Sequence, residues 1–517
     1  MEGELVRRVL AALLREDHLG LHTRGRLDGD LWTAPLPDGR RAVFAVERDG
    51  FLAEHTAAAL TVAGQPVDTL AGVLAALAPA ESDAEATAGW ADFATECAAA
   101  LDAAHDQLPL DPPGPRTGYA GLLRYDALAA AHGHPVYPTG RARPGLDAAA
   151  RRAFAPEFAR PFTLRWRFVA RDGLRISPGL AADPPTWWPP APDGWFALPA
   201  HPLTAPDGPC GPTVVATLSM RTLALVDEPG VHVKVPLAVS ALGSRNRRTI
   251  KPGTLADGAA MHALLAAVLD REPELAGSVL LADERRFAEG PTEDVAVLVR
   301  HLPPAVADDR LASLAALPVR DPRTGTTVLD DLAGDDRAGW FDRYLSVLLD
   351  WHVALWVRYG IALESHQQNI TVADGAGRIR LVYKDDDGAR VDAAHVTAAL
   401  GHPPPVFADV RMLAADPTEL ADLFVTITLH LCVRAVAPDP ALLHGVRDRI
   451  AAAADRWCDR GEPRSVAARA AVHRMLAARR WPVKAMVTAG TLLPKTRLGC
   501  TDVNKHYVRT GPNYLEG

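Results

Sequence analysis

A run of polar residues at 363–369, LESHQQN, separates two strongly apolar stretches. Before it, residues 339–359 repeat apolar side chains at helical spacing up to Gly360, a residue type that commonly ends helices. After it, residues 369–388 alternate as a strand, turn at ADGAG and alternate again. A long helix and a β-hairpin must therefore meet at a polar junction formed by Glu364, His366, Gln368 and Asn369.

The chain divides into three stretches of different character. Residues 1–115 are rich in Ala and Leu at helical spacing and end in the proline-rich LPLDPPGP, where a helix cannot continue. Residues 116–302 contain short β-rich runs such as FTLRWRFVA and VHVKVPLAVSAL between Pro- and Gly-rich loops. Residues 303–517 return to long helices interrupted by the hairpin. We predict an α+β fold with a helical N-terminal part, a central and mostly antiparallel sheet, and a helix-rich C-terminal part that carries a β-hairpin.

Composition excludes several classes of protein. The net charge of −8 is dispersed, which is unfavourable for a large nucleic-acid surface. No apolar stretch reaches the roughly 20 residues that a membrane helix needs, and the first residues predict an amphipathic helix rather than a secretion signal. The five cysteines form no CxxC pair, which favours a reducing compartment and argues against zinc. We expect a cytoplasmic protein that acts on small anionic molecules.

The polar junction has the residue types of a nucleotide and metal site. Asn369 opens the hairpin, and the acidic residues Asp385, Asp386 and Asp387 follow its second strand. Amide and carboxylate oxygens hold Mg²⁺ on nucleotide phosphates, and a hairpin brings its two ends together. The alternative is a polar pair at a strand end followed by a solvated acidic turn.

A second group of residues is cationic. Ser219 and Arg221 lie two apart, which on a strand places both on one face, opposite Leu218 and Met220. Lys234 is a single cation within apolar HVKVPL, and Arg245, Arg247 and Arg248 follow. Arginine and lysine in such a cluster suit phosphate or carboxylate groups. The alternative is a lysine at a sheet edge and arginines on the surface.

Two further segments carry candidate residues. The Pro- and Gly-rich loop GHPVYPTGRARPGL, residues 133–146, can present His134, Tyr137, Arg141 and Arg143. LLPKTRLGC near the end of the chain places Lys495 and Arg497 two apart, and the simplest interpretation of this pair is a basic surface on a helix.

Taken in order, these segments resemble the NRPS-independent siderophore synthetases, the aerobactin-synthetase-like IucA/IucC family. The matching motifs are GHPVYPTGRARPGL with FAPEF, AHPL, SMRT, HVKVPL through RRT, ESHQQN, YKDDDG and PKTRL. They occur in the family's order and span residues 130–500. The chain departs from the family pattern where Tyr137 replaces a histidine, Arg141 a lysine and Lys384 an arginine.

The resemblance implies a cupped hand, with a helical thumb at 1–115, β-rich fingers at 116–302 and a helix-rich palm at 303–517. It also implies an ATP- and Mg²⁺-dependent ligase, and a homodimer. A carboxylate such as citrate attacks the α-phosphate of ATP, pyrophosphate leaves, and an amine, hydroxylamine or alcohol captures the acyl-adenylate. No nucleic acid or membrane partner is implied.

The resemblance further implies roles for individual residues. Those expected to bind ATP are His134, Ser219, Arg221, Thr222, Lys234, Arg247, Gln368, Asn369 and Asp386. The expected Mg²⁺ ligands are Glu364, Asn369, Asp385 and Asp386. Those expected to bind the acyl substrate are Arg248, His366, Lys495 and Arg497, and those expected to act in catalysis are Lys234, Arg248, Glu364 and His366. Whether Arg247 or Arg248, and Asp385 or Asp386, occupies the family position stays open.

Two other functions compete with this interpretation. A kinase-like phosphotransferase also places His, Asn and Asp around a hairpin, but it would need a Gly-rich loop and a following lysine near the start of the chain. The second competing function is that of a degenerate synthetase, which binds a siderophore or nucleotide without turnover. The replacement at Tyr137 favours it.

Overall fold

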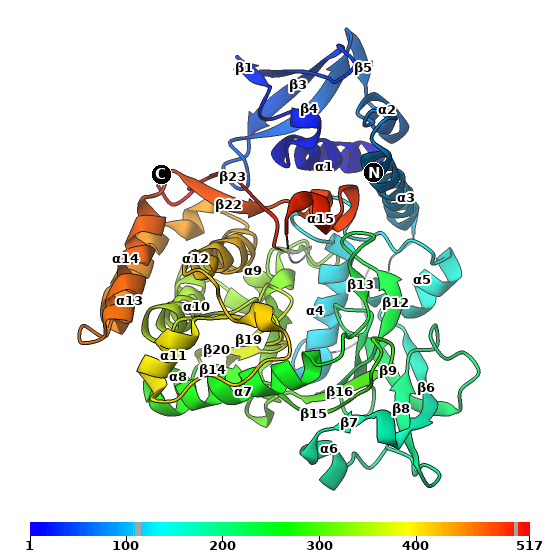
Figure 1. The fold of residues 1–517 in the computed structure, drawn as a ribbon, viewed down its shortest axis with the longest axis vertical. Coiled ribbons are helices and arrows are strands. Elements are labelled where there is room, and N and C mark those ends of the chain that lie inside the picture. The colour runs from blue at the N-terminus through cyan, green and yellow to red at the C-terminus, as the bar shows by residue number, and fades with distance from the viewer. Residues whose placement is uncertain (107, 109–114, 501–504, 517) are drawn as a thin grey trace.

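Helices and sheets both build the fold, and the structure, a computed structural model, describes residues 1–106, 108, 115–500 and 505–516 (Figure 1). The largest sheet has the strand order β7-β15-β16-β11-β10-β9-β6-β8, and all its neighbouring strands pair antiparallel. The prediction of a central antiparallel sheet is confirmed. Its strands are β6 (Pro161–Ala170), β7 (Arg175–Ile176), β8 (Trp195–Ala200), β9 (Cys210–Ala216), β10 (Thr222–Leu225), β11 (Val231–Lys234), β15 (Asp283–Glu289) and β16 (Ala296–His301).

The N-terminal part is not wholly helical, so that prediction is partly wrong. Besides α1 (Glu2–Arg15), α2 (Leu70–Ala76) and α3 (Ala84–His105), it contains a five-stranded antiparallel sheet. Its strands are β1 (Arg26–Asp28), β2 (Leu31–Pro35), β3 (Arg41–Arg48), β4 (His55–Val62) and β5 (Gln65–Val67).

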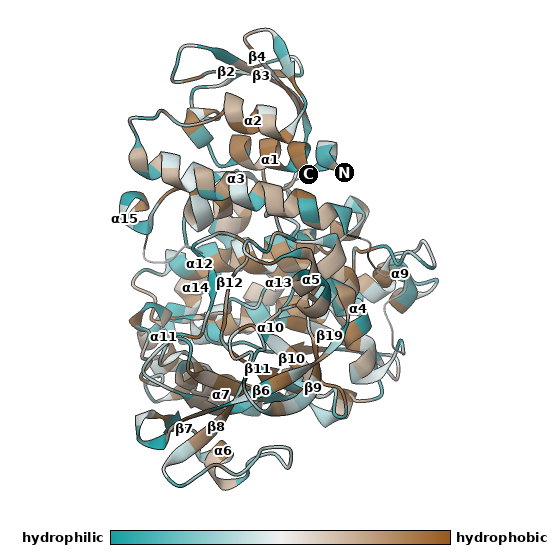
Figure 2. Cartoon of the chain, turned by 90° about the vertical axis from the view of Figure 1, so that its right-hand side faces the viewer, coloured by the Kyte–Doolittle hydropathy of each residue, from teal (hydrophilic) through white to brown (hydrophobic). Residues whose placement is uncertain are grey.

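The reason for this sheet is visible in the order of its residues. Ala and Leu suggest a helix by propensity, but β3 buries alternate side chains, Ala42, Phe44 and Val46, and this period of two favours a strand. These side chains share one core cluster with Leu5 and Val9 of α1. Figure 2 shows α1 and α2 mostly in the hydrophobic colour, as expected for helices that pack on this sheet.

The predicted helix and hairpin of the C-terminal part are present. Helix α10 (Arg337–Tyr359) ends at Gly360, which has the left-handed φ of 68°. Strands β19 (Ile370–Gly375) and β20 (Arg378–Tyr383) pair antiparallel across the predicted turn. They form the centre of a sheet with the order β14-β20-β19-β17, in which β14 (Val279–Leu281) is parallel to β20 and β17 (Arg310–Ser313) is antiparallel to β19.

Helices surround this second sheet, and the buried face of α10 supplies much of their common core, including Trp340, Trp351 and Trp356. They are α4 (Gly118–His132), α7 (Thr254–Arg271), α8 (Pro273–Ala276), α9 (Val328–Ala333), α11 (Ala393–Leu400), α12 (Thr418–Leu423), the π-helical η7 (Phe424–Arg434), α13 (Val446–Trp457) and α14 (Pro463–Ala477). No helix in the described ranges is both long and apolar enough to cross a membrane.

The last segment of the chain returns to the N-terminal part. Strands β22 (Arg480–Lys484) and β23 (Tyr507–Pro512) pair antiparallel, and the π-helical η9 (Thr488–Leu492) and α15 (Lys495–Leu498) lie between them in sequence. Figure 1 shows these red and orange elements below the blue helix α1. Shorter elements of the described chain are α5 (Ala148–Phe154), α6 (Pro178–Ala182), β12 (Leu237–Ser240), β13 (Arg247–Arg248), β18 (Ile361–Ala362) and β21 (Arg390–Val391).

Candidate active site

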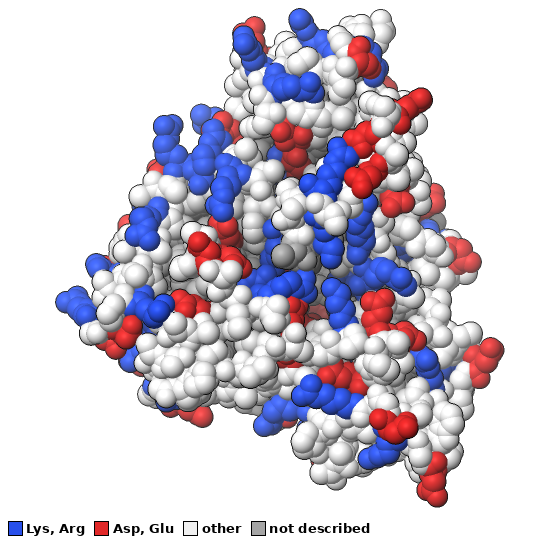
Figure 3. Space-filling model, viewed as in Figure 1, with Lys and Arg blue, Asp and Glu red and all other residues white. Residues whose placement is uncertain are grey.

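A cavity of about 340 Å³ lies between the large sheet and the C-terminal part of the chain. Three segments supply most of its polar lining: the loop after α4, the strands β10 and β11 with the turn before them, and the polar junction between α10 and β19. The opposite wall is apolar and includes Ile427 and Leu431 of η7 and Met486. In the space-filling view, Lys and Arg side chains gather around a hollow at the centre of the face (Figure 3).

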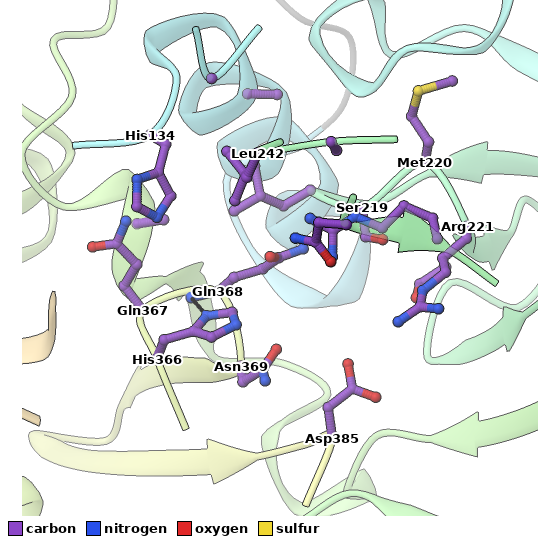
Figure 4. Close-up of a pocket in the computed structure, with 18 of the residues that line it drawn as sticks. His134, Ser219, Met220, Arg221, Leu242, His366, Gln367, Gln368, Asn369 and Asp385 are labelled. Carbon is purple, nitrogen blue, oxygen red and sulfur yellow. Dashed lines mark hydrogen bonds between the residues drawn. The ribbon is translucent and has the colours of Figure 1, made fainter. Parts of the chain in front are cut away.

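The phosphate-binding candidates come together in this cavity. Ser219, Arg221, Thr222 and Lys234 all line it, and Thr222 is paired with Lys234 across β10 and β11. Figure 4 shows Ser219 and Arg221 at the cavity. The prediction that Ser219 and Arg221 lie on a strand is wrong. They form the turn between β9 and β10, closed by a hydrogen bond from the Thr222 amide to the Ser219 carbonyl at 3.2 Å. A turn does not alternate faces, so Leu218 and Met220 line the cavity as well.

Lys234 and Asp385 form the central ion pair of the site. The ammonium of Lys234 is 2.6 Å from Asp385 Oδ1, and Arg300 Nη2 donates to the same oxygen at 2.7 Å. Burial acts to raise the pKa of Asp385, but Arg300 and Lys234 outweigh it and hold that pKa well below its ordinary value. Glu284 accepts a hydrogen bond from the Asp385 amide at 3.0 Å. This bond helps to hold the left-handed backbone conformation of Asp385, whose φ is 60°.

Sequence reasoning missed Arg300 and Glu284. Arg300 carries the same signal as Lys234, since it is a lone cation in the apolar strand VAVLVRH, and it lies on β16 beside β11. Glu284 gives no such signal because it stands in a charged segment, DERR, where a carboxylate is usually solvated. Its burial follows only from the pairing of β15 with β16.

The three aspartates after β20 differ in position. Asp385 and Asp387 line the cavity, whereas Asp386 is 4% exposed and does not. Asp386 Oδ1 has no hydrogen-bond partner within the described residues. Burial, together with the neighbouring carboxylates, raises the pKa of Asp386 well above its ordinary value. A buried carboxylate oxygen without a partner is suited to a cation. Figure 4 shows the side chains of Asn369 and Asp385 near one another in the cavity.

Glu364 is engaged by lysines. Its two carboxylate oxygens accept from Lys484 at 2.9 Å and from Lys505 at 2.8 Å. Burial acts to raise the pKa of Glu364, but the two ammonium groups outweigh it and hold the pKa well below its ordinary value. With both oxygens paired in this way, Glu364 is a less suitable Mg²⁺ ligand than the resemblance implied. Within the described residues, no group of three or more His, Cys, Asp or Glu side chains is arranged to hold a metal ion.

The two histidines of the site are neutral hydrogen-bond donors. His134 Nδ1 accepts from the amides of Val136 and Tyr137 at 3.1 and 3.0 Å, and His366 Nδ1 accepts from the amide of Gln368 at 3.3 Å. The ring proton of each is therefore on Nε2. Burial lowers the pKa of His134 to about 3 and that of His366 to about 4. A role for His366 as a general base near neutral pH is not favoured, because its free nitrogen already accepts a hydrogen bond.

Three arginines give the cavity its positive charge. Arg143, Arg221 and Arg248 line it, and no carboxylate of the described chain forms an ion pair with any of them. Arg143 donates to the carbonyls of Gly140 and Ala142, and Arg221 to that of Thr249. Burial, and then repulsion by Arg221 and Arg143, lowers the pKa of Arg248 to about 9.

The structure resolves some alternatives and removes other candidates from the cavity. Gln368 and Asn369 line it, and Arg248 does so while Arg247 is exposed. Lys495 and Arg497 are exposed on α15 and do not line the cavity. Arg497 instead pairs with Asp83 at 2.6 Å. The sequence had not indicated Lys484, which lines the cavity from β22.

Comparisons with known proteins find similarity to siderophore synthetases over parts of the chain. Residues 122–206 and 197–319 match the IucA / IucC family, and residues 338–499 match the family described as ferric iron reductase FhuF-like transporter. The rhizobactin siderophore biosynthesis protein RhbC of Rhizobium meliloti is 29% identical over 50% of this chain and 52% of its own length. Staphyloferrin A synthase of Staphylococcus aureus is 28% identical over 34% of this chain and 32% of its own length. The chain spans about half the length, or less, of the curated relatives it matches.

Solved structures of this group share the fold over nearly the whole chain. The petrobactin biosynthesis protein AsbB from Bacillus anthracis has a TM-score of 0.76 and 16% identity, over 99% of this chain and 95% of its own. The ATP-bound aerobactin synthetase IucA from Klebsiella pneumoniae has a TM-score of 0.66 and 17% identity over 100% of both chains. At these identities the likeness concerns the fold.

Proposed function

We propose that the chain belongs to the IucA/IucC family of NRPS-independent siderophore synthetases and that it is an ATP-dependent ligase. The match of residues 122–319 to this family, the similar siderophore biosynthesis proteins and the shared fold support this proposal. The ligase adenylates a small di- or tricarboxylate such as citrate and condenses it with an amine, hydroxylamine or alcohol. The products of the first step are an acyl-adenylate and pyrophosphate, and the second step releases AMP.

One observation carries the proposal: three buried or half-buried arginines face one cavity with no carboxylate partner in the described chain. Such charges are costly unless an anion neutralises them. A triphosphate and a polycarboxylate together supply this negative charge, and the planar guanidinium groups suit both. The cavity volume of about 340 Å³ is within the range of small-molecule sites.

The residues have complementary tasks in this reaction. Ser219, Arg221, Thr222 and Lys234 bind the phosphates, and Arg248 with Arg143 orients the attacking carboxylate. Cations at this place reduce the repulsion between the two anions and stabilise the charge that grows on the leaving pyrophosphate. Holding both reactants in one cavity replaces a bimolecular encounter, which contributes on the order of 7–11 kcal/mol. His134 and His366, with Nε2–H groups, donate to oxygens of the nucleotide or the acyl group.

Mg²⁺ fits the acidic end of the cavity. Asn369 and Asp385, which line the cavity, would hold it, and Asp386, which is buried outside the lining, would contribute the oxygen that has no partner within the described residues. Bound there with the nucleotide, the ion would offset phosphate charge.

The thumb, fingers and palm of a cupped hand correspond in this proposal to residues 1–115, 116–302 and 303–517. The residues that line the cavity all come from the second and third of these regions. A homodimer and a cytoplasmic location remain predictions from the family and the composition.

The proposal is tested by phosphorus NMR of the nucleotide products. Purified protein is incubated with MgATP and a panel of di- and tricarboxylates, with hydroxylamine present to trap an adenylate. We expect AMP and pyrophosphate with one acid, and much less of both when Lys234→Met replaces the wild type. Release of ADP instead would identify a phosphotransferase.

A second candidate function is non-catalytic binding of a siderophore or nucleotide. It is favoured by the match of residues 338–499 to an iron-handling family. In the same experiment it predicts that ATP persists with every acid while a ferric siderophore binds, as measured by quenching of tryptophan fluorescence.

A further inference from the structure

The loop that presents His134 to the cavity is held on two sides. On the inner side, the amides of Val136 and Tyr137 donate to His134 Nδ1 at 3.1 and 3.0 Å, so the backbone of the loop sets the orientation of the imidazole. Figure 4 shows this ring at the edge of the cavity, next to Gln367. A displacement of the 134–137 backbone would therefore displace the ring with it.

On the outer side, helix α1 binds the carbonyls of the same loop. Arg8 Nη2 donates to the carbonyl oxygens of His134 and Tyr137 at 2.5 and 2.9 Å, and Arg15 Nη2 donates to that of Val136 at 3.3 Å. Arg8 and Arg15 are about two helical turns apart and so lie on one face of α1. Helix α1 thus binds the carbonyl of His134, which carries the imidazole. It also binds the carbonyls of Val136 and Tyr137, whose amides donate to that imidazole.

The contacts of Arg8 are unusual for an arginine. No carboxylate of the described chain forms an ion pair with it, and burial lowers its pKa. Its neighbour Arg7, in contrast, is exposed and pairs with Glu4. Two charge-assisted hydrogen bonds to carbonyls are therefore the principal polar interactions of the Arg8 guanidinium.

Helix α1 also holds the opposite wall. Glu16, the residue after its last turn, accepts from the amides of Val487 and Thr488 at 3.3 and 2.8 Å. These amides follow Met486 and Lys484, which line the cavity. Helix α1 lies in the region before residue 122, where the family match begins, and contributes no side chain to the cavity. Its polar contacts nevertheless reach both walls.

We propose that Arg8 is a positioning residue for nucleotide binding, which acts through the carbonyls of His134 and Tyr137 to hold the His134 imidazole in the cavity. This inference rests on the proposed function, in which His134 contacts the nucleotide. Helix α1 is on this view a part of the active site that touches no substrate.

The first test compares Arg8→Met with Arg7→Met, which removes an arginine from the same helix but leaves the loop untouched. Isothermal titration with a non-hydrolysable ATP analogue and Mg²⁺ gives the affinity, and AMP release gives KM and kcat. We expect Arg8→Met to weaken analogue binding and raise the KM for ATP about tenfold, as the loss of a charge-assisted hydrogen bond implies. We expect kcat to change less than about twofold, and Arg8→Lys, which can still reach one carbonyl, to fall in between.

A double-mutant cycle separates positioning from a general loss of structure. If Arg8 acts through His134, then in the His134→Ala background the change Arg8→Met has little further effect on affinity. Additive effects, or an Arg8→Met protein that binds like Arg7→Met, would overturn the inference. If wild-type protein binds no ATP analogue at all, the proposed function fails instead, and the two failures are thus distinguished. Arg15→Met provides a second variant if Arg8→Met does not fold, and it is expected to weaken binding in the same direction.

Discussion

Replacing Arg248 by methionine tests the central electrostatic argument about the cavity. Methionine keeps much of the length and apolar stem of arginine but removes the charge. Each hydrogen bond between arginine and a phosphate or carboxylate contributes about 1.5–3 kcal/mol. Since about 1.4 kcal/mol is a factor of ten, losing one such interaction should lower kcat/KM by roughly 10- to 100-fold.

The effect on stability should have the opposite sign. In the protein without ligand, burial and then repulsion by Arg221 and Arg143 lower the pKa of Arg248 to about 9, so its charge opposes folding at neutral pH. Removing that charge should leave the midpoint of thermal unfolding unchanged or raise it. An anion bound at this place should also raise the midpoint of the wild type more than that of the variant.

The assay is pyrophosphate release at varied acid and ATP concentrations, with differential scanning fluorimetry of the same samples. The matched control is Arg247→Met, because Arg247 is the adjacent residue on β13 and is exposed. The control should retain kcat/KM within about twofold, as is usual for a surface substitution. Equal losses in both variants, or a marked fall in the unfolding midpoint of Arg248→Met alone, would refute the reasoning.

Three further predictions follow from the contacts of the site. Burial lowers the pKa of His366 to about 4, so the ring stays neutral near physiological pH. The pH profile of kcat/KM should therefore show no inflection near the ordinary histidine pKa of 6.5. An inflection there that disappears in His366→Asn would contradict the donor role. The carboxylate of Glu364 has a pKa held below its ordinary 4.5, so its stabilisation is fully present above pH 4.5 and is lost as the pH falls through the folded-state pKa. Glu364→Gln should lower the free energy of unfolding by about 3 kcal/mol at pH 7, with the difference narrowing in acid, as measured by urea denaturation; a constant difference would argue against the ion pairs. Finally, the Tyr137 hydroxyl donates to Glu96 at 2.7 Å, and Tyr137 does not line the cavity. Tyr137→Phe should therefore cost about 1–2 kcal/mol of stability without changing ATP affinity, and a selective loss of affinity at unchanged stability would show that the phenol belongs to the site.

Tyr137 also bears on the departure from the family pattern. In place of a histidine, this chain has a fully buried phenol that hydrogen-bonds Glu96 of α3 and lies 3.1 Å from the hydroxyl of Thr491 in η9. The residue thus connects the His134 loop with two other segments. The replacement does not remove a group from the cavity in this fold, and it is weak support for a degenerate synthetase.

Local patterns predicted the elements that rest on local rules. The apolar period before Gly360 predicted α10, and the alternation around ADGAG predicted β19 and β20. The lone cation among apolar residues predicted that Lys234 is buried in a sheet. The N-terminal sheet was missed because its strands are rich in alanine and leucine, whose propensity for helices hid the period of two.

The partners of the charged residues could not be predicted. Asp385 is 151 residues from Lys234 in sequence, and Lys484 is 120 residues from Glu364. No local rule relates such positions, because their distance depends on how two sheets and a C-terminal strand pack against one another.

The sequence by itself determined that the strongly periodic segments form α10 and the β19–β20 hairpin, and that polar side chains lie at the end of α10. These properties depend on neighbours a few positions away, through backbone geometry and the alternation of faces. Only the tertiary structure decided that Arg248 rather than Arg247 faces the cavity, that Asp386 is buried outside its lining, and that α1 holds the His134 loop. Those outcomes depend on burial and on the approach of distant segments, which set the electrostatic cost of each charge and thereby its role.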